Sequence, residues 1–341
     1  MGNVKVLDCT LRDGGYVNNW EFGENNIQNI CEKLEQTNVD IIELGFMRDV
    51  NYDPNKSLFR TIEQANHVIR SQKENIIYSA LVEMANPYPL ELLEQKKEGG
   101  VELLRYSFWK RCIDEAYEYA SKIREKGYQL GVQPTRVEQY SDEEFGLMCR
   151  RFSALKPFAI YIVDTFGLLT KEQLIRYARI ADENVGDGIR IGYHSHNNMQ
   201  QAFSNATTFI EMGLQHDVVI DASIYGMGRG AGNLNLEMIC NYLNAITPHR
   251  FAETPIYQAW DDCIHEIYSR LPWGYSLEYF IAAANQCNPN YPYYYKKQYP
   301  KMSVEQLKRI FDLITGEDKY LYSEAKAEAY YIKAQDTEKS L

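Results

Sequence analysis

Residues 4–13 are Val4-Lys5-Val6-Leu7-Asp8-Cys9-Thr10-Leu11-Arg12-Asp13, a short apolar run that ends in polar and charged side chains. The apolar run has the length and the β-branched composition of a buried strand. A helical pattern follows at residues 24–36, and a second apolar run begins at Ile41. The stretch is therefore the start of a strand–helix unit, and polar residues mark the end of its strand.

Eight such units are predicted between residues 4 and 245. The predicted strands span residues 4–9, 41–46, 76–82, 103–107, 129–133, 159–163, 189–194 and 218–223, and the helices that follow them span residues 24–36, 58–71, 89–98, 113–126, 141–155, 171–183, 199–212 and 234–245. Eight parallel units favour a (β/α)₈ TIM barrel, whose usual length is about 250 residues, over a doubly wound open sheet. In both folds, ligands bind at the C-terminal ends of the strands.

The chain of 341 residues is long enough for a barrel and an appended domain. We predict a catalytic barrel at residues 1–250 and a helical C-terminal domain at residues 251–341. Helical patterns in the second part span residues 256–271, 276–285, 303–315 and 322–334. An aromatic loop is predicted at residues 288–295, and its tyrosines suit internal packing better than a homodimer contact. The polar tail after Ala334 is expected to fray.

Composition narrows the class of protein. The net charge of −11 argues against nucleic-acid or anionic-membrane partners, which require a basic surface. The sequence has neither an apolar run of about 18 residues nor a signal-type segment. Its seven cysteines are scattered without a C-x-x-C pair, which indicates reduced thiols rather than disulfides or structural zinc. We therefore expect a cytoplasmic protein that acts on a small molecule.

Two strand ends carry residue types that bind metals. Asp13 follows the first strand, and His194 and His196 lie at the end of the seventh. Because side chains alternate along a strand, the two histidines face the same side. Two imidazoles and a carboxylate form a plausible ligand set for a divalent cation. The alternative is a pair of histidines satisfied by hydrogen bonds.

Several motifs together resemble the metal-dependent lyase and aldolase superfamily that includes HMG-CoA lyase, isopropylmalate synthase and 4-hydroxy-2-oxovalerate aldolase. The resemblance is strongest to the last of these. It is carried by Asp8-Cys9-Thr10-Leu11-Arg12-Asp13-Gly14, His194-Ser195-His196, Asp164-Thr165-Phe166-Gly167, Val219-Ile220-Asp221-Ala222-Ser223, Gly226-Met227-Gly228-Arg229-Gly230-Ala231-Gly232-Asn233 and Gly274-Tyr275-Ser276.

The resemblance implies a (β/α)₈ barrel with a helical C-terminal domain and one divalent cation, Mn²⁺ or Mg²⁺. It also implies a carbon–carbon lyase of the class II aldolase type, which joins the enolate of a 2-oxo acid such as pyruvate to an aldehyde or reverses that step. Aldolases of this type work with an aldehyde dehydrogenase partner. A Schiff-base lysine is not needed, which agrees with the lack of lysine in the strand-end motifs.

The same resemblance assigns roles. Asp13, His194 and His196 match the metal ligands. Asn233 matches a weaker oxygen ligand or a hydrogen-bond partner of a ligand, and the alternative is a loop residue that tolerates a left-handed turn.

Arg12 is expected to stabilise the enolate oxygen and to be positioned by an ion pair with Glu43. Thr165 matches a donor to the substrate carboxylate, with a helix N-cap as the alternative. Asp8 and Asp164 are expected to be structural.

The sequence departs from the aldolase pattern at Tyr16, where those enzymes carry a histidine three residues after the motif aspartate. A phenol, with a pKa of about 10, is a poor base unless its surroundings lower that value. A nearby cation and Arg12 could lower it, or Tyr16 could act as a general acid. A water on the metal, Tyr275 or an unidentified residue could be the base instead. Because of Tyr16, the identity of the aldehyde substrate stays open.

Three other interpretations remain. A Claisen-type acyl-CoA condensing enzyme of the isopropylmalate synthase kind shares the metal motif, but the chain shows no clear CoA signature. A lyase of the HMG-CoA kind needs a cysteine in the loop at residues 226–233, which has none. A non-catalytic barrel serving as a scaffold or subunit is favoured by Tyr16 and opposed by the retained Arg12 and Asp13.

Overall fold

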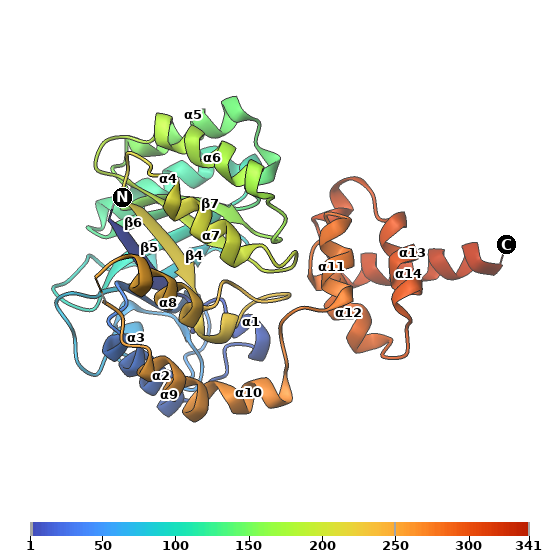
Figure 1. Ribbon diagram of the computed structural model, residues 1–341, viewed down its shortest axis with the longest axis horizontal. Helices are drawn as coiled ribbons and strands as arrows, with labels where there is room; N and C mark the ends of the chain where they lie inside the picture. Colours follow the sequence, from blue (N-terminus) through green and yellow to red (C-terminus); the bar gives the residue numbers. More distant parts are fainter. Residues whose placement is uncertain (1–2, 249, 340–341) are drawn as a thin grey trace.

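The computed structural model describes residues 3–248 and 250–339, and it is a (β/α)₈ TIM barrel with a helical C-terminal part (Figure 1). The predicted fold class is therefore confirmed. Eight parallel strands close the barrel, and β1 pairs with both β2 and β9. The barrel strands are β1 (Val4–Asp8), β2 (Ile41–Met47), β4 (Ile77–Glu83), β5 (Val101–Phe108), β6 (Gln129–Pro134), β7 (Ala159–Asp164), β8 (Arg190–Ser195) and β9 (Val218–Ala222).

Six long helices lie outside the strands and agree with the predicted pattern. They are α2 (Glu24–Thr37), α4 (Ile113–Glu125), α5 (Asp142–Ser153), α6 (Lys171–Asn184), α7 (Ala202–Glu211) and α8 (Leu236–Ile246). Capping boxes start α5 at Ser141 and α6 at Thr170, and each of these side chains accepts a hydrogen bond from the backbone of the first turn. Two short helices are α1 (Gly15–Asn18), which follows β1, and α3 (Ile62–Asn66), which follows β3.

Two predicted helices are wrong. At residues 58–71, the strand β3 (Leu58–Phe59) pairs with β2 before the five-residue α3 begins, because the apolar start of this segment is buried against β2. At residues 89–98, only a 3₁₀ turn forms, η1 (Leu90–Leu92). Leu93 is extended, and the residues after it are polar, so no apolar face holds a longer helix against the barrel.

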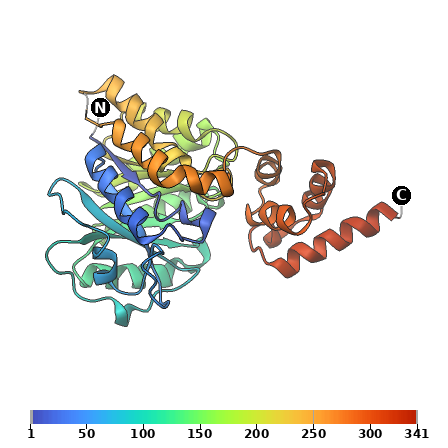
Figure 2. The same ribbon diagram turned by 90° about the horizontal axis from the view of Figure 1, so that it is seen from below.

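The C-terminal part divides between two apolar clusters. The first segment shares the apolar cluster of the barrel, which extends to Trp273. This segment consists of α9 (Thr254–Ala259), a π turn (Trp260–Ile264) and α10 (His265–Arg270). A second cluster is built by α11 (Leu277–Ala284), α12 (Asn290–Gln298), α13 (Val304–Leu313) and α14 (Glu324–Lys339). Figures 1 and 2 show these four helices beside the barrel. The domain boundary at residue 250 stays a prediction.

The predicted aromatic loop at residues 288–295 is wrong, because helix α12 starts at Asn290. Tyr291 and Tyr295 lie one turn apart and are buried against Phe311, so tertiary packing outweighs the weak helical composition. Pro292 is tolerated because it lies in the first turn. The tail after Ala334 is likewise helical, since α14 continues to Lys339.

Candidate active site

A cavity of about 820 Å³ opens at the C-terminal ends of the barrel strands, where the fold predicts ligand binding. Barrel residues form most of its wall, and Asn288, Asn290 and Tyr320 of the C-terminal part complete it. Arg229 joins the two parts, because its guanidinium donates to Asn288 Oδ1 at 2.8 Å and to Asn290 Oδ1 at 3.0 Å. The cavity therefore lies between the barrel and the helices that follow it.

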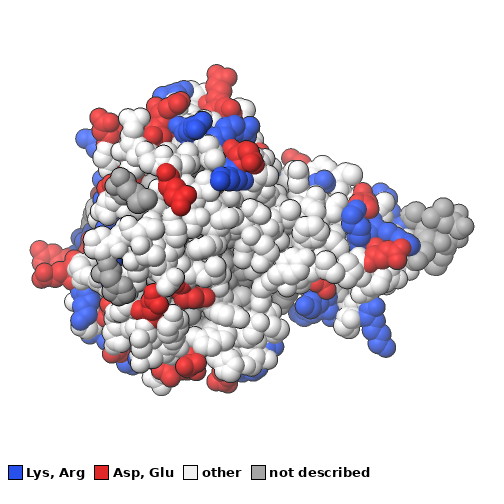
Figure 3. All heavy atoms as spheres, in the orientation of Figure 1, with Lys and Arg blue, Asp and Glu red and all other residues white. Residues whose placement is uncertain are grey.

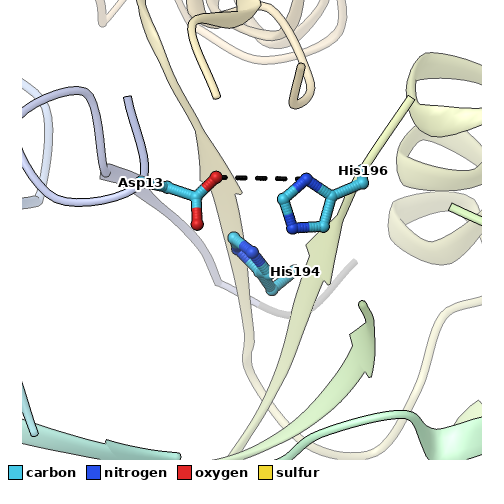
Figure 4. A group of neighbouring side chains, drawn as sticks. All are labelled: Asp13, His194 and His196. Carbon is cyan, nitrogen blue, oxygen red and sulfur yellow. Dashed lines mark ion pairs between the residues drawn. The ribbon is translucent and has the colours of Figure 1, made fainter. Parts of the chain in front are cut away.

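Asp13, His194 and His196 come together in this cavity from opposite ends of the barrel sequence. Their candidate ligand atoms all lie within 4.8 Å of one another, and all three side chains are buried (Figure 4). Asp13 lies in a tight turn after β1, in which its N–H donates to the carbonyl oxygen of Cys9 at 2.8 Å. Gly14 permits this turn, since a Cβ there would lie 2.2 Å from the carbonyl oxygen of Thr10.

The surroundings of the two histidines suit metal ligands. His194 Nδ1 lies 2.9 Å from Asp221 Oδ2, which favours the tautomer that leaves Nε2 free. Burial lowers the pKa of His196 to about 4, although Asp13 acts in the opposite direction. His196 Nδ1 is buried without a hydrogen-bond partner and lies 3.9 Å from Asp13 Oδ2. Neutral imidazoles beside a carboxylate are the state in which this set of donors binds a divalent cation.

Asp13 is held as a carboxylate. Burial raises its pKa, but the charge of Arg12, with smaller effects of the neighbouring imidazoles and of the Asn233 hydrogen bond, outweighs burial and holds the pKa well below its usual value. Asn233 is its neighbour, and Asn233 Nδ2 donates to Asp13 Oδ2 at 3.0 Å. Asn233 Oδ1 is buried and has no hydrogen-bond partner in the part of the chain that the structure describes. A Cβ at Gly228 would lie 2.4 Å from Asn233 Nδ2, so the glycine-rich loop is what allows this close approach.

Arg12 lies next to the cluster and faces the cavity. Its Nε donates to Glu43 Oε2 at 2.7 Å, and its Nη1 pairs with Asp13. Its Nη2 is buried and has no hydrogen-bond partner among the described residues. The side chain is thus fixed from two sides and keeps one donor for a ligand.

Thr165 lines the same cavity and is not a helix cap. The N-cap of α6 is Thr170, whereas Thr165 Oγ1 accepts a hydrogen bond from the N–H of Arg136 at 2.8 Å. The hydroxyl proton of Thr165 therefore stays available to an acceptor in the cavity. Asp164 is structural, as predicted, because its carboxylate accepts from the N–H groups of Leu168 and Leu169.

Tyr16 also lines the cavity, at the start of α1. Burial raises its pKa above the ordinary value, and the nearby carboxylate of Glu83 raises it further, which outweighs the opposite effects of Arg229 and Arg12. The positive charges of Arg12 and Arg229 alone therefore do not make Tyr16 an ionised base. Its hydroxyl donates to Glu83 Oε2 at 3.4 Å and remains a proton donor.

Residues 102–257 match the HMGL-like family model, from β5 to the start of α9. The chain carries an HMGL-like domain. The matched segment includes His194, His196 and Asn233, whereas Asp13 lies before it. The superfamily that the motifs predict is therefore confirmed.

Named relatives extend the similarity of this HMGL-like chain. A 4-hydroxy-2-oxovalerate aldolase of Geobacillus genomosp. 3 is 24% identical over 71% of the chain and 70% of the relative. An oxaloacetate decarboxylase of Mycobacterium tuberculosis is 23% identical over 80% of the chain and 79% of the relative. The N-terminal domain of a proposed aldolase from Bacteroides vulgatus superposes with a TM-score of 0.71 and 21% identity, covering 86% of this chain and 97% of that one. The relatives confirm the predicted enzyme class, a carbon–carbon lyase.

The sequence analysis missed Arg105, a fully buried residue in β5 of the HMGL-like domain. Its Nη1 lies 2.9 Å from Glu43 Oε2, and its Nη2 pairs with Asp221. A continuous chain of charges thus crosses the barrel, and its order is Asp13, Arg12, Glu43, Arg105, Asp221 and His194. This chain of charges contains three carboxylates and two guanidinium groups. Its uncompensated negative charge favours a cation between Asp13 and His194, the residues at its two ends. The sequence feature that could have identified Arg105 was a charged residue inside an otherwise apolar strand.

Glu83 at the end of β4 is the second residue that sequence reasoning missed. Its Oε1 pairs with Arg48 and accepts from Asn86 Nδ2 at 2.7 Å, while its Oε2 faces Tyr16. An acid at a strand end of a barrel was the available signal, as it was for Glu43. Tyr275, in contrast, is 56% exposed and is absent from the cavity wall, so the structure does not bring it to the site.

On the face shown in Figure 3, acidic and basic side chains are interspersed, and lysine and arginine form no large patch there among the described residues. Every helix in the described part of the chain is too short or too polar to cross a membrane.

Proposed function

We propose that the protein is a divalent-metal-dependent aldolase that forms or cleaves a bond between the enolate of a 2-oxo acid, such as pyruvate, and an aldehyde. The observation that carries the proposal is the buried Asp13–His194–His196 cluster beside the unpaired Nη2 of Arg12. The aldolase and decarboxylase names of the relatives support the same class of chemistry. The metal that we propose is Mn²⁺ or Mg²⁺.

The inner end of the cavity suits a 2-oxo acid. Asp13, His194 and His196 would hold the cation, with Asn233 as a neighbour that has a free oxygen. The bound cation supplies Lewis-acid polarisation of the 2-oxo group. The Thr165 hydroxyl donates to the substrate carboxylate, and Arg12 Nη2 donates to the carbonyl oxygen that becomes the enolate oxygen.

Tyr16 and Glu83 are the proposed groups that move the proton on the aldehyde side. In cleavage, the C4 hydroxyl proton passes through the Tyr16 phenol to the Glu83 carboxylate, the C3–C4 bond breaks, and its electron pair enters the enolate. In condensation, the phenol donates a proton to the new alkoxide, and Glu83 returns one to Tyr16. A phenol with a raised pKa is protonated at neutral pH and suits this donor role.

Decarboxylation of a 2-oxo diacid is the second candidate, supported by the relative named oxaloacetate decarboxylase. Loss of carbon dioxide from the diacid would produce the same enolate at the same inner end of the cavity. The Tyr16–Glu83 pair favours the aldolase, because decarboxylation has no hydroxyl proton to remove. A homodimer, an aldehyde dehydrogenase partner and a cytoplasmic location stay predictions.

The proposed function is tested with pyruvate alone in deuterated water. We expect Mn²⁺ or Mg²⁺ to promote exchange of the methyl protons, measured by proton NMR, and we expect chelation to abolish it. His194→Ala should lose both the exchange and the bound metal, because one of three ligands is gone. Circular dichroism and metal analysis of the purified variant provide the controls. Absence of exchange at every pH where the protein is folded, or full metal content in His194→Ala, would contradict the proposal.

Removing the hydroxyl of Tyr16 tests the proton transfer. Tyr16→Phe should lower the rate of pyruvate addition to acetaldehyde by at least about 100-fold, because it removes a positioned general acid. The exchange rate with pyruvate alone should fall much less, since the aldehyde is not involved. Tyr52→Phe, at an exposed residue outside the cavity, is the matched control. Equal losses in both reactions would assign Tyr16 to the enolate step instead.

A further inference from the structure

The cavity is larger than pyruvate and a two-carbon aldehyde require. Its volume of about 820 Å³ lies within the range of about 300–1,000 Å³ that holds drug-sized ligands. The inner end contains the metal-ligand cluster, and the outer end extends past β5 and β6 to Tyr320 of the C-terminal part. A larger aldehyde partner is needed to fill the outer end.

The wall of the cavity carries an excess of positive charge, although the chain as a whole carries −11. The basic side chains that line it are Arg12, Arg48, Lys110, Arg111, Arg136 and Arg229. Of the three acidic side chains, Asp13 and Glu83 are paired with Arg12 and Arg48, and Glu317 is exposed. The remaining basic groups therefore meet little negative charge within the cavity.

Arg136 is the most informative of these groups. It is only 9% exposed, and its Nε and Nη2 make no hydrogen bond among the described residues. Its Nε lies 3.7 Å from Glu138 Oε1, beyond hydrogen-bond distance, and Glu138 lines a separate hollow of about 520 Å³. The guanidinium carbon lies 3.7 Å from the ring centre of Tyr320, which limits its movement. Arg136 thus forms an ion pair with Glu138, but its Nε and Nη2 still lack acceptors among the described residues, and such buried donors are costly unless a bound anion meets them.

The backbone of Arg136 connects the outer end of the cavity to the inner one. Its φ of 59° lies in the left-handed region, which is uncommon for a residue other than glycine. Such strain persists where the surrounding structure requires it, and here the N–H of Arg136 donates to Thr165 Oγ1. One turn thus positions both the proposed carboxylate donor and the buried guanidinium.

Arg111 adds a second positive charge at this end. It is exposed, and its guanidinium carbon lies 4.7 Å from a ring centre of Trp109. Burial lowers the pKa of Arg136, partly offset by Glu138 and Tyr320, and the charge of Arg111 lowers it further. Two neighbouring cations repel each other, and an anion bound between them removes this repulsion.

We propose that Arg136 and Arg111 bind an anionic group, a carboxylate or a phosphate, at the far end of the aldehyde partner. The inference rests on the proposed function and narrows its second substrate to anionic aldehydes. The aromatic side chains of Trp109 and Tyr320 line the same end of the cavity. Arg136 acts as a specificity residue and takes no part in bond formation.

Two pairs of aldehydes test the inference, each combined with pyruvate and Mn²⁺ or Mg²⁺. Succinic semialdehyde against butanal tests the carboxylate, and glyceraldehyde 3-phosphate against glyceraldehyde tests the phosphate. The wild type should prefer the anionic member of at least one pair in kcat/KM by tenfold or more. Arg136→Gln should lower this preference by about 10- to 100-fold, the worth of a charge-assisted hydrogen bond. The pair that shows the preference identifies the anion.

Binding provides a measurement that does not depend on turnover. Succinate and inorganic phosphate are titrated calorimetrically into the protein with saturating oxalate at the inner end. We expect at least one of them to bind, and to bind at least tenfold more weakly to Arg136→Gln. Arg111 is exposed, so Arg111→Gln leaves the fold intact, and this variant should bind the same anion more weakly. Arg179→Gln on the outer surface of α6 is the matched control and should bind as the wild type does.

The outcomes separate this inference from the proposed function. If pyruvate exchange occurs but no aldehyde pair shows a charge preference, only the anion subsite is overturned. If exchange is absent, the aldolase proposal fails, and the titrations still decide whether Arg136 binds an anion. Equal affinities in Arg136→Gln and Arg179→Gln would overturn the subsite in either case.

Discussion

Arg12→Lys should slow pyruvate methyl exchange by about 10²- to 10³-fold, the usual cost of removing one preorganised donor to a developing oxyanion. Lysine keeps the positive charge, but it lacks the planar group with which Arg12 meets Glu43 and Asp13 and still presents Nη2 to the cavity. The loss should appear mainly in kcat, because the interaction strengthens as charge builds on the enolate oxygen. Deuterium exchange followed by NMR measures it directly.

Metal content decides between two explanations of such a loss. Arg12 pairs with Asp13, so a variant could act by weakening the metal site. We expect Arg12→Lys to retain metal at saturating Mn²⁺ while the exchange stays slow. Arg179→Lys is the matched control on the outer surface of α6. A near-normal rate for Arg12→Lys with bound metal would remove Arg12 from the enolate step and favour a scaffold role for the site.

Arg105→Met should destabilise the fold by about 3–5 kcal/mol, the cost of removing one partner from a buried ion pair. Arg105 is fully buried between Glu43 and Asp221, so its loss leaves two carboxylates without their shared cation. Methionine fills a similar length, which limits the contribution of a cavity. Urea unfolding at neutral pH, followed by circular dichroism, measures the change in the free energy of unfolding.

A second set of variants identifies the cause. If unpaired charge is responsible, adding Asp221→Asn to Arg105→Met should recover part of the lost stability, because one buried charge disappears. Arg179→Met, on the surface, should stay within about 0.5 kcal/mol of the wild type. A loss below about 1 kcal/mol for Arg105→Met would show that the charge chain contributes little to folding.

The barrel could be predicted from the sequence because each strand is a short apolar run between polar residues. Such a run is buried most readily as a strand in the core. β1 and β9, for example, begin at the predicted residue and end within one residue of it. Prediction failed where tertiary contacts outweigh local preference. Leu58 and Phe59 fit a helical pattern but pair with β2, and the tyrosines of α12 make a helix from a sequence with loop composition.

The site residues likewise fall into those that the sequence places correctly and those that depend on tertiary contacts. His194 lies near the end of a strand, and Asp13 and His196 follow strands, so the closed ring of the barrel places all three at one mouth without further information. The roles of Arg105 and Arg136 depend on partners far away in the sequence, such as Asp221 and Tyr320. Periodicity contains no information on those partners. Tyr275 shows the opposite error, since a motif match alone does not place a side chain in a cavity.

The shared wall of the cavity has a consequence for how the substrate range of this protein can change. The proposed metal ligands belong to barrel strands and their ends, whereas Asn288, Asn290 and Tyr320 come from the C-terminal part, which has an apolar cluster of its own. Arg229 holds the two parts together through side-chain amides rather than through charge. Substitutions in the helical part can therefore reshape the outer wall and leave the metal ligands as they are. One part of the cavity wall is thus encoded outside the barrel segments that carry Asp13, His194 and His196, and it can diverge without them.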